Sequence, residues 1–135
     1  MTIIALLVGV SLVSFDGIRK SARDSKRKAD LETIRSALEI YRTDCRTYPG
    51  SADFVIGTTT QLVGQESVSG CTDVVYLETI PTDTYSATSQ YYYYRISGNS
   101  YVLCAHLENS DADEVADCGS NCGTGISCNY AAYNP

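Results

Sequence analysis

The 135-residue sequence lacks the short motifs that mark several classes of enzyme. It has no HExxH zinc motif and no glycine-rich phosphate-binding loop. Its single histidine is His106, which alternates with Cys104 on an expected strand. A Ser–His–Asp or Cys–His catalytic arrangement needs a histidine that its neighbours orient, and no such partner can be named here. We therefore predict that the protein is not an enzyme.

Cysteine is missing from the first 44 residues, and the CxxC motif of thioredoxin-like proteins is missing from the whole chain. All the cysteines lie further on, in a region rich in Gly, Ser and Asn: Cys45, Cys71, Cys104, Cys118, Cys122 and Cys128. An even number of cysteines in such a region predicts a disulfide framework and an exported domain, although the sequence does not decide the pairing. The run from Cys118 to Cys128 also allows a metal site, but disulfides are favoured because no histidine lies nearby.

Basic residues are almost absent from the second part of the chain. Nine of the ten lie between Arg19 and Arg46, and Arg95 is the only later one. Residues 1–46 therefore have a net charge of +3 and residues 47–135 a net charge of −9. The acidic part should repel nucleic acid, so we predict no nucleic-acid partner.

Six of the ten residues in the segment 19–28 are Lys or Arg. This segment directly follows an apolar run, where basic residues form a collar beside a membrane span. On a helix the same residues form i,i+4 ion pairs, here Lys26 with Asp30 and Lys28 with Glu32. Both interpretations stay open.

The first 15 residues, MTIIALLVGVSLVSF, carry no charge and are apolar on every face of a helix. From Asp16 onward the apolar residues recur at helical spacing, which predicts one continuous helix that ends near Cys45, before Tyr48-Pro49-Gly50. The stripe consists of Ile18, Ala22, Ala29, Leu31, Ile34, Leu38 and Tyr41, and we expect Leu31, Ile34, Leu38 and Tyr41 to pack on a sheet. A small domain cannot bury so long a helix, so one half must project. We assign residues 1–18 to an apolar polymerisation or transmembrane half and residues 19–48 to an amphipathic half.

The remaining residues, 49–135, are expected to form a globular head. QYYYYRIS and SYVLCAHLE flank Gly98-Asn99 and predict an antiparallel hairpin at about residues 90–108. On its first strand, Tyr92 and Tyr94 should face the side opposite to Tyr91 and Tyr93. Residues 109–135 have no periodicity and are expected to be a disulfide-stapled loop. The fold class is therefore α+β, a long N-terminal helix packed on a small antiparallel sheet.

The acidic run DADEVAD within the C-terminal loop offers oxygen ligands for Ca²⁺. The candidate ligands are Asp111, Asp113 and Asp117. The run does not fit the EF-hand spacing, and a solvated acidic loop is the alternative. We expect no required cofactor, and the sequence allows calcium at these aspartates.

Three stretches resemble the superfamily of type IV pilins and major pseudopilins of type II secretion: VSFDGIRKSARDSKRKADLETIRSALEIYRTDCRTYP, YLETIPTD and YVLCAHLE. The resemblance covers residues 3–108 and is most specific at residues 22–48. It implies the pilin fold and a structural subunit of an extracellular type IV pilus-like filament, built through the apolar helix. Aligned on VSF, Met1 corresponds to about the tenth residue of a mature member, so about nine further apolar residues, including a glutamate, are expected to precede it.

The resemblance also implies partners and locations. The chain is expected to bind copies of itself and the pilus assembly machinery, and to wait in the inner membrane before it joins a filament on the cell surface. The polymerisation core would comprise the large apolar residues of the first half: Ile3, Ile4, Leu6, Leu7, Val8, Val10, Leu12, Val13 and Phe15. Two alternatives stay open, a periplasmic major pseudopilin of a type II secretion system and a membrane-anchored binding module that never polymerises. The sequence does not decide whether a filament serves adhesion, motility, DNA uptake or secretion.

Overall fold

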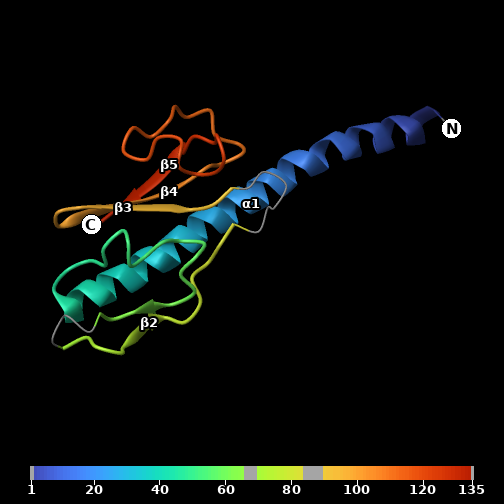
Figure 1. Cartoon of the computed structure of the whole chain (residues 1–135). Coiled ribbons are helices and arrows are strands. Elements are labelled where there is room, and N and C mark those ends of the chain that lie inside the picture. The colour runs from blue at the N-terminus through green and yellow to red at the C-terminus, as the bar shows by residue number, and fades with distance from the viewer. Residues whose placement is uncertain (1, 66–69, 84–89, 135) are drawn as a thin grey trace.

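The computed structural model describes residues 2–65, 70–83 and 90–134, with residues 2–14 as helical backbone. One helix, α1 (Thr2–Cys45), packs with its C-terminal half against a head of two small antiparallel sheets. Its N-terminal half extends well beyond the head (Figure 1). The α+β class and the long helix that packs on antiparallel sheet are as predicted.

The helix ends at Cys45, as the sequence predicts. Arg46 adopts a left-handed conformation with φ of 65°, and its N–H donates to the carbonyl of Arg42 at 2.9 Å. Such a residue closes a helix, and the Pro at position 49 disfavours its continuation. With 44 residues, α1 is about 66 Å long. Over the described residues, α1 contains no window with the length and hydropathy of a membrane span.

The head contains two separate sheets rather than the one expected. Strands β1 (Leu62–Val63) and β2 (Val75–Leu77) form a short antiparallel pair. Strands β3 (Tyr93–Ser97) and β4 (Ser100–Ala105) form the predicted hairpin. Gly98 at its turn has φ of 60°, the sign that the first central position of a type II′ turn requires.

The expectation that residues 109–135 are loop throughout was wrong at one place. Strand β5 (Tyr130–Tyr133) pairs with the second edge of β4, from Val102 opposite Tyr133 to Ala105 opposite Tyr130. The pairing satisfies backbone groups that an open edge of β4 would leave exposed. The segment is too short to show a period of its own. His106, expected on a strand, follows the last residue of β4.

The core lies between α1 and the sheets. The predicted packing residues Leu31, Ile34, Leu38 and Tyr41 are all fully buried there. Tyr92 and Tyr94 are buried with them, whereas the side chain of Tyr91 is 43% exposed. The Tyr-rich segment thus alternates between core and solvent as a strand does.

The single apolar stripe predicted along α1 is in fact two stripes. Ile18, Ala22 and Ala29 are exposed, although the sequence placed them in line with Leu31. The step from Ala29 to Leu31 is only two residues, which is about 200° around a helix. The two sets therefore lie on opposite faces of α1, and only the set that begins with Leu31 meets the head.

Candidate assembly surface

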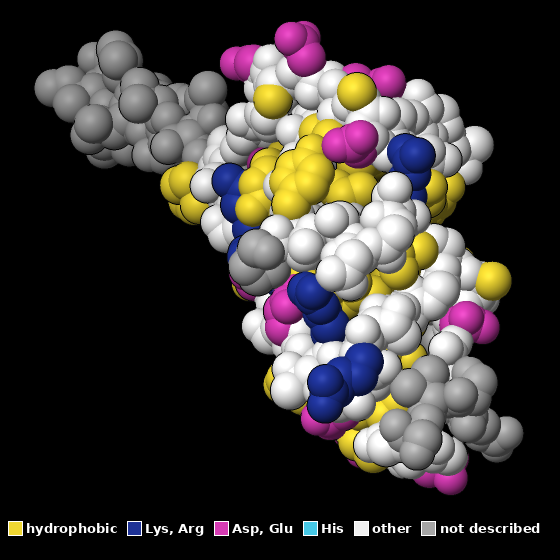
Figure 2. Space-filling view, turned by 90° about the vertical axis from the view of Figure 1, so that its left-hand side faces the viewer, with side chains coloured by type: hydrophobic (Ala, Val, Ile, Leu, Met, Phe, Trp, Pro, Cys, Tyr) yellow, Lys and Arg dark blue, Asp and Glu magenta, His cyan; other side chains and the backbone are white. Residues whose placement is uncertain are grey.

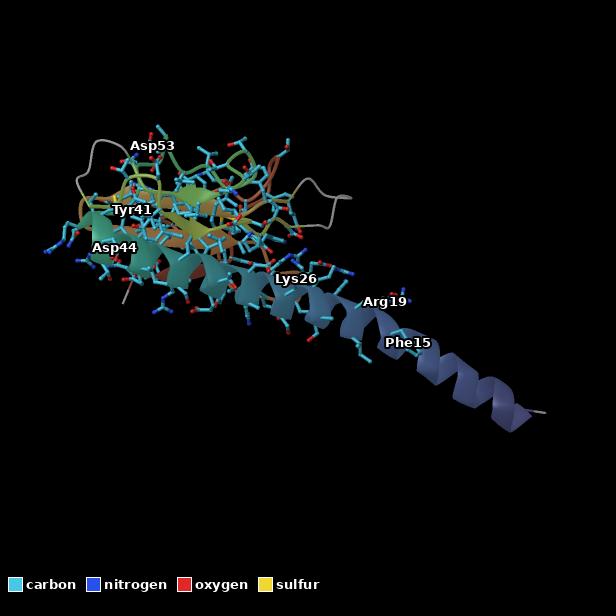
Figure 3. The ribbon with its side chains drawn as sticks, turned by 90° about the horizontal axis from the view of Figure 1, so that it is seen from below. Phe15, Arg19, Lys26, Tyr41, Asp44 and Asp53 are labelled. Carbon is cyan, nitrogen blue, oxygen red and sulfur yellow. A yellow bond between two sulfur atoms is a disulfide. The ribbon has the colours of Figure 1, made fainter. Side chains whose placement is uncertain are left out.

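The first part of this surface is the half of α1 that leaves the head. Hydrophobic side chains lie on the helix where this half meets the head (Figure 2). Phe15 and Arg19 lie on the projecting half, whereas Tyr41 and Asp44 lie beside the head (Figure 3). The side chains of Phe15 and Ile18 are 55% and 60% exposed. Within this one molecule, the described residues leave more than half of each of them exposed.

The second part is a stripe along α1 that faces away from the head, which we name the outer face. Its members are exposed and follow one another at spacings of three or four residues: Ile18, Ala22, Ser25, Ala29, Thr33, Ser36 and Ile40. This spacing confines them to an arc of about 80° on the helix. Small side chains between two isoleucines let another helix approach closely.

Two of the three hydroxyl groups on the outer face, those of Thr33 and Ser36, find acceptors within the helix itself. Thr33 Oγ1 donates to the carbonyl of Ala29 at 3.0 Å, and Ser36 Oγ donates to the carbonyl of Glu32 at 2.9 Å. Because these two groups already have acceptors, burying them would leave neither hydroxyl donor without an acceptor. The outer face can therefore be buried at little cost.

On the opposite face, α1 is fixed to the head by a cluster of buried polar side chains, which we name the Arg27 cluster. Arg27 is 1% exposed. Its Nε donates to Asp83 at 2.7 Å, its Nη1 to Asp24 at 2.8 Å and Glu108 at 2.9 Å, and its Nη2 to Gln90 at 2.8 Å. Burial would lower the pKa of Arg27, but these acidic partners together raise it. One side chain of the helix thus binds the segments before β3 and after β4.

Glu108 and Asp24 complete the cluster. Arg23 binds both carboxylate oxygens of Glu108, with 2.6 Å from Nε to Oε1. The hydrogen bonds from Arg23, followed by those from Arg27, lower the pKa of Glu108 to about 2 despite partial burial. The carboxylate of Asp24 accepts the backbone N–H groups of Glu108 and Asn109, both at 2.9 Å. The cluster therefore fixes the angle at which the projecting half leaves the head.

Tyrosine hydroxyls from the head make further contacts with acidic residues of α1. Tyr92 donates to Asp30 at 2.7 Å, and Tyr101 donates to Glu39 at 2.9 Å. Burial, together with these carboxylate acceptors, raises the pKa of both tyrosines. These phenols stay protonated and keep donating, so they hold the helix against the β3–β4 hairpin.

The basic residues of segment 19–28 have different kinds of partner, which the sequence did not indicate. Lys26 pairs with Asp30 at 2.6 Å, as predicted. Lys28 instead places its Nζ 5.3 Å from the centre of the Tyr130 ring. Arg27 was not singled out from its basic neighbours by sequence reasoning. The signal that could have found it is its spacing, since residues 27, 31, 34 and 38 share one helix face.

The six cysteines form three disulfides. Cys45–Cys71 ties the end of α1 to the segment before β2, with a Cα–Cα distance of 5.2 Å. Cys104–Cys118 joins β4 to the C-terminal part at 6.4 Å, and Cys122–Cys128 closes a short loop within that part at 5.2 Å. Cys104–Cys118 therefore holds the segment from residue 109 onward against β4.

The three candidate calcium ligands do not converge. Asp111, Asp113 and Asp117 are all exposed, and the carboxylate of Asp117 accepts the hydroxyl of Tyr133 at 3.2 Å. Acidic side chains gather at the top of the head in Figure 2, where the C-terminal part lies. Within the described part of the chain, the one group of three His, Cys, Asp or Glu side chains that could share a metal ion is Cys104, Cys118 and Cys128. Calcium at the three aspartates stays a prediction.

Most of the predicted polymerisation core falls on residues whose side chains lie outside the described part of the structure. These are Ile3, Ile4, Leu6, Leu7, Val8, Val10, Leu12 and Val13. Their backbone is helical and belongs to the projecting half. Phe15 is the member whose side chain is described, and it is exposed.

A long helix that is half embedded in a small disulfide-bonded head, with an exposed stripe of small and apolar residues on its far side, defines a class of structural subunits. Comparison with protein families finds one match, to "Type II secretion system (T2SS), protein G", over residues 16–115. The chain belongs to this family of structural pseudopilins. Comparisons with curated proteins and with solved structures give no significant match.

Proposed function

We propose that the protein is the structural subunit of a helical filament that assembles through α1. The observation that carries the proposal is the outer face, an exposed stripe of small and apolar residues that continues into the projecting half of the same helix. Burial of one large apolar side chain such as Ile18 or Ile40 stabilises an interface by about 1.5–3 kcal/mol relative to water. A second copy of α1 supplies a surface of the right length and chemistry.

Residues 1–18 act in this proposal as the polymerisation half. Before assembly they reside in the inner membrane, and during assembly they exchange lipid for copies of themselves, so that packing contacts rather than release from water supply most of the gain. Each copy joins the next by the same offset without closing a ring, which produces an open helix. The chain contributes no catalytic step.

The family match favours a filament of the type II secretion kind, a periplasmic pseudopilus. An extracellular pilus-like filament is the second candidate: the disulfide-bonded C-terminal part suits a subunit that stays exposed outside the cell, although the oxidising periplasm preserves disulfides as well. Imaging cells that express the protein at native level separates these two functions. Long surface filaments that shear off and contain the chain support the pilus, and filaments confined to the periplasm support the pseudopilus.

The filament proposal is tested by placing a charge in the apolar helix bundle at the centre of the filament. We expect Leu7→Asp or Val10→Asp to abolish assembly, because a carboxylate in an apolar helix bundle has no partner. Electron microscopy of the assembled material is the measurement. Intact fibres in both variants, or a full-length chain that stays a detergent-solubilised monomer under all assembly conditions, would contradict the proposal and favour a membrane-anchored binding module.

A further inference from the structure

The head contains a cleft that is separate from the outer face of α1. Its walls are the turn at residues 55–58 and the start of the Tyr-rich segment at residues 90–92, with residues 82 and 83 at one end. The volume of about 560 Å³ lies within the ~300–1,000 Å³ that is typical of sites for small ligands. A second hollow of about 280 Å³ shares four lining residues with it and follows the same segment to Tyr94. We name these two adjoining hollows the Tyr91 cleft.

The lining of the Tyr91 cleft combines apolar and hydrogen-bonding groups. The side chains of Tyr91 and Val55 are 43% and 42% exposed. The same lining contains the hydroxyl groups of Thr58 and Thr82 and the side-chain amide of Gln90. Sites for small ligands have this composition, in which an apolar and aromatic lining carries a few polar groups that orient the ligand.

Both walls of the cleft are held in place by hydrogen bonds within the head. The turn is closed by the N–H of Thr59, which donates to the carbonyl of Val55 at 2.9 Å. The segment before the turn is tied to β3, because the hydroxyl of Tyr94 donates to the carbonyl of Pro49 at 2.8 Å. On the opposite wall, the N–H of Tyr91 donates to a carbonyl of the C-terminal part at 3.1 Å. The cleft is therefore formed without a ligand, so that binding does not have to order its walls.

The charges around the cleft favour a neutral ligand. Among the described residues that line it there is one carboxylate, Asp83, and no Lys or Arg. Asp83 is already paired with Arg27 at 2.7 Å, and the head around the cleft has ten acidic residues and one basic residue in positions 47–135. An anion would be repelled, and a wholly apolar ligand would take the hydroxyl and amide groups out of water without replacing their hydrogen bonds. A neutral ligand with an apolar face and several hydroxyl groups meets both conditions.

We propose that the Tyr91 cleft binds a neutral oligosaccharide. One face of a sugar ring presents C–H groups, which pack on the ring of Tyr91, and the hydroxyl groups at its rim exchange hydrogen bonds with Thr58 and Gln90. Because the second hollow extends the cleft, it accommodates more than one sugar unit. This binding goes beyond the proposed filament and does not depend on it, since every residue named belongs to one chain.

The test uses the full-length, isotope-labelled chain in a zwitterionic detergent that has no sugar headgroup. Maltotetraose, cellotetraose and chitotetraose are titrated in turn, and the backbone amide signals are followed by NMR. We expect saturable shifts with at least one of these sugars at both walls of the cleft, including the amides of Thr58 and Tyr91. No saturable shift with any of the three, or shifts confined to other parts of the head, overturns the proposal. Saturable binding of tetraalanine at the same amides, without binding of a sugar, also overturns it and assigns the cleft to peptides.

Two tyrosines that are similarly exposed separate the cleft from ordinary surface. Tyr91→Ala removes the ring from the cleft and should weaken sugar binding by about tenfold or more, whereas Tyr91→Phe keeps the ring and should weaken it less. Tyr133→Ala is the matched control, because Tyr133 is 50% exposed but borders a hollow of only about 160 Å³. It should bind with wild-type affinity. Equal affinity of Tyr91→Ala and wild type, or a loss in Tyr133→Ala alone, overturns the assignment.

Discussion

The two halves of α1 share one backbone but differ in what surrounds them. From Asp24 to Cys45 a face of the helix is buried, and every buried polar group of the Arg27 cluster has a partner. Before Asp24, the described side chains are exposed or half-exposed, including Phe15 and Ile18. The embedded half is therefore stabilised within one molecule, whereas we propose that the projecting half gains its packing from other molecules.

The embedded half itself has two faces with different purposes. Its inner face, with Leu31, Ile34 and Leu38, is the core of the head. Its outer face carries small residues and Ile40, which is 56% exposed. Substitutions on the inner face should thus change the free energy of unfolding, and substitutions on the outer face should change assembly alone.

The largest effect on stability is expected from Arg27→Ala. This change leaves Asp24, Asp83 and Glu108 without their shared buried cation, and removal of one partner from such a cluster costs about 3–5 kcal/mol. The neighbouring Lys26→Ala is the matched control. Lys26 is also paired with an aspartate but its side chain is 52% exposed, so its loss should cost no more than about 0.5 kcal/mol. Urea unfolding of the detergent-solubilised chain measures both, and equal costs would contradict a buried anchor.

A core substitution on the inner face should have a similar or slightly smaller effect. Leu38→Ala removes a fully buried side chain, and we expect a loss of about 2–5 kcal/mol in the free energy of unfolding. Ile40→Ala, two residues along the same helix, should change that free energy by less than about 0.5 kcal/mol because the side chain is exposed. Thermal unfolding of the two variants is the measurement. A large loss from Ile40→Ala would show that the outer face is covered within one molecule.

A smaller loss of the free energy of unfolding is expected at acidic pH. The pKa of Glu108 is about 2 in the folded protein and 4.5 for a free side chain, so the group binds its proton more readily when the chain is unfolded. Its contribution to stability is therefore complete above pH 4.5 and is lost as the pH falls from about 4.5 to 2. The loss should be of order 2 kcal/mol.

Glu108→Gln provides the comparison for this acid effect. It should be less stable than wild type at pH 7 by a similar amount, with the difference shrinking towards pH 2. Glu32→Gln, which changes an exposed carboxylate on the same helix, should keep the wild-type dependence on pH. Unfolding free energies measured between pH 2 and pH 7 decide the matter, and parallel curves for wild type and Glu108→Gln would refute the assignment.

Much of the fold could be predicted from local sequence signals. The end of α1 follows from Pro49, the hairpin follows from Gly98-Asn99 between alternating strands, and the inner face follows from the spacing of Leu31, Ile34 and Leu38. Strand β5 could not be predicted, because four residues carry no period and their pairing depends on the distant edge of β4. Patterns within a short segment predict helices and hairpins, whereas the pairing of β5 with β4 depends on residues far apart in the sequence.

The anchor of α1 was missed for the same reason. Arg27 stands among other basic residues, and its partners Asp83 and Glu108 lie 56 and 81 positions further along the chain. Its spacing from Leu31, Ile34 and Leu38 places Arg27 on the buried face of the helix, but no local pattern identifies its distant partners. The outer face could not be recognised from the sequence either. Alanines at helical spacing resemble a continuation of the core stripe as long as the side of the helix that contacts the head is unknown.

One paired measurement tests the central claim most directly. Ile40→Asp places a charge on the outer face, and Val75→Asp places the same charge at an exposed valine of β2 that is away from α1's outer face. Each variant is produced in cells that carry the assembly machinery, and filaments are counted by electron microscopy. We expect both variants to keep the wild-type free energy of unfolding. Val75→Asp should form filaments of normal length, and Ile40→Asp should form few or none. Normal filaments from Ile40→Asp would contradict assembly through the outer face of α1.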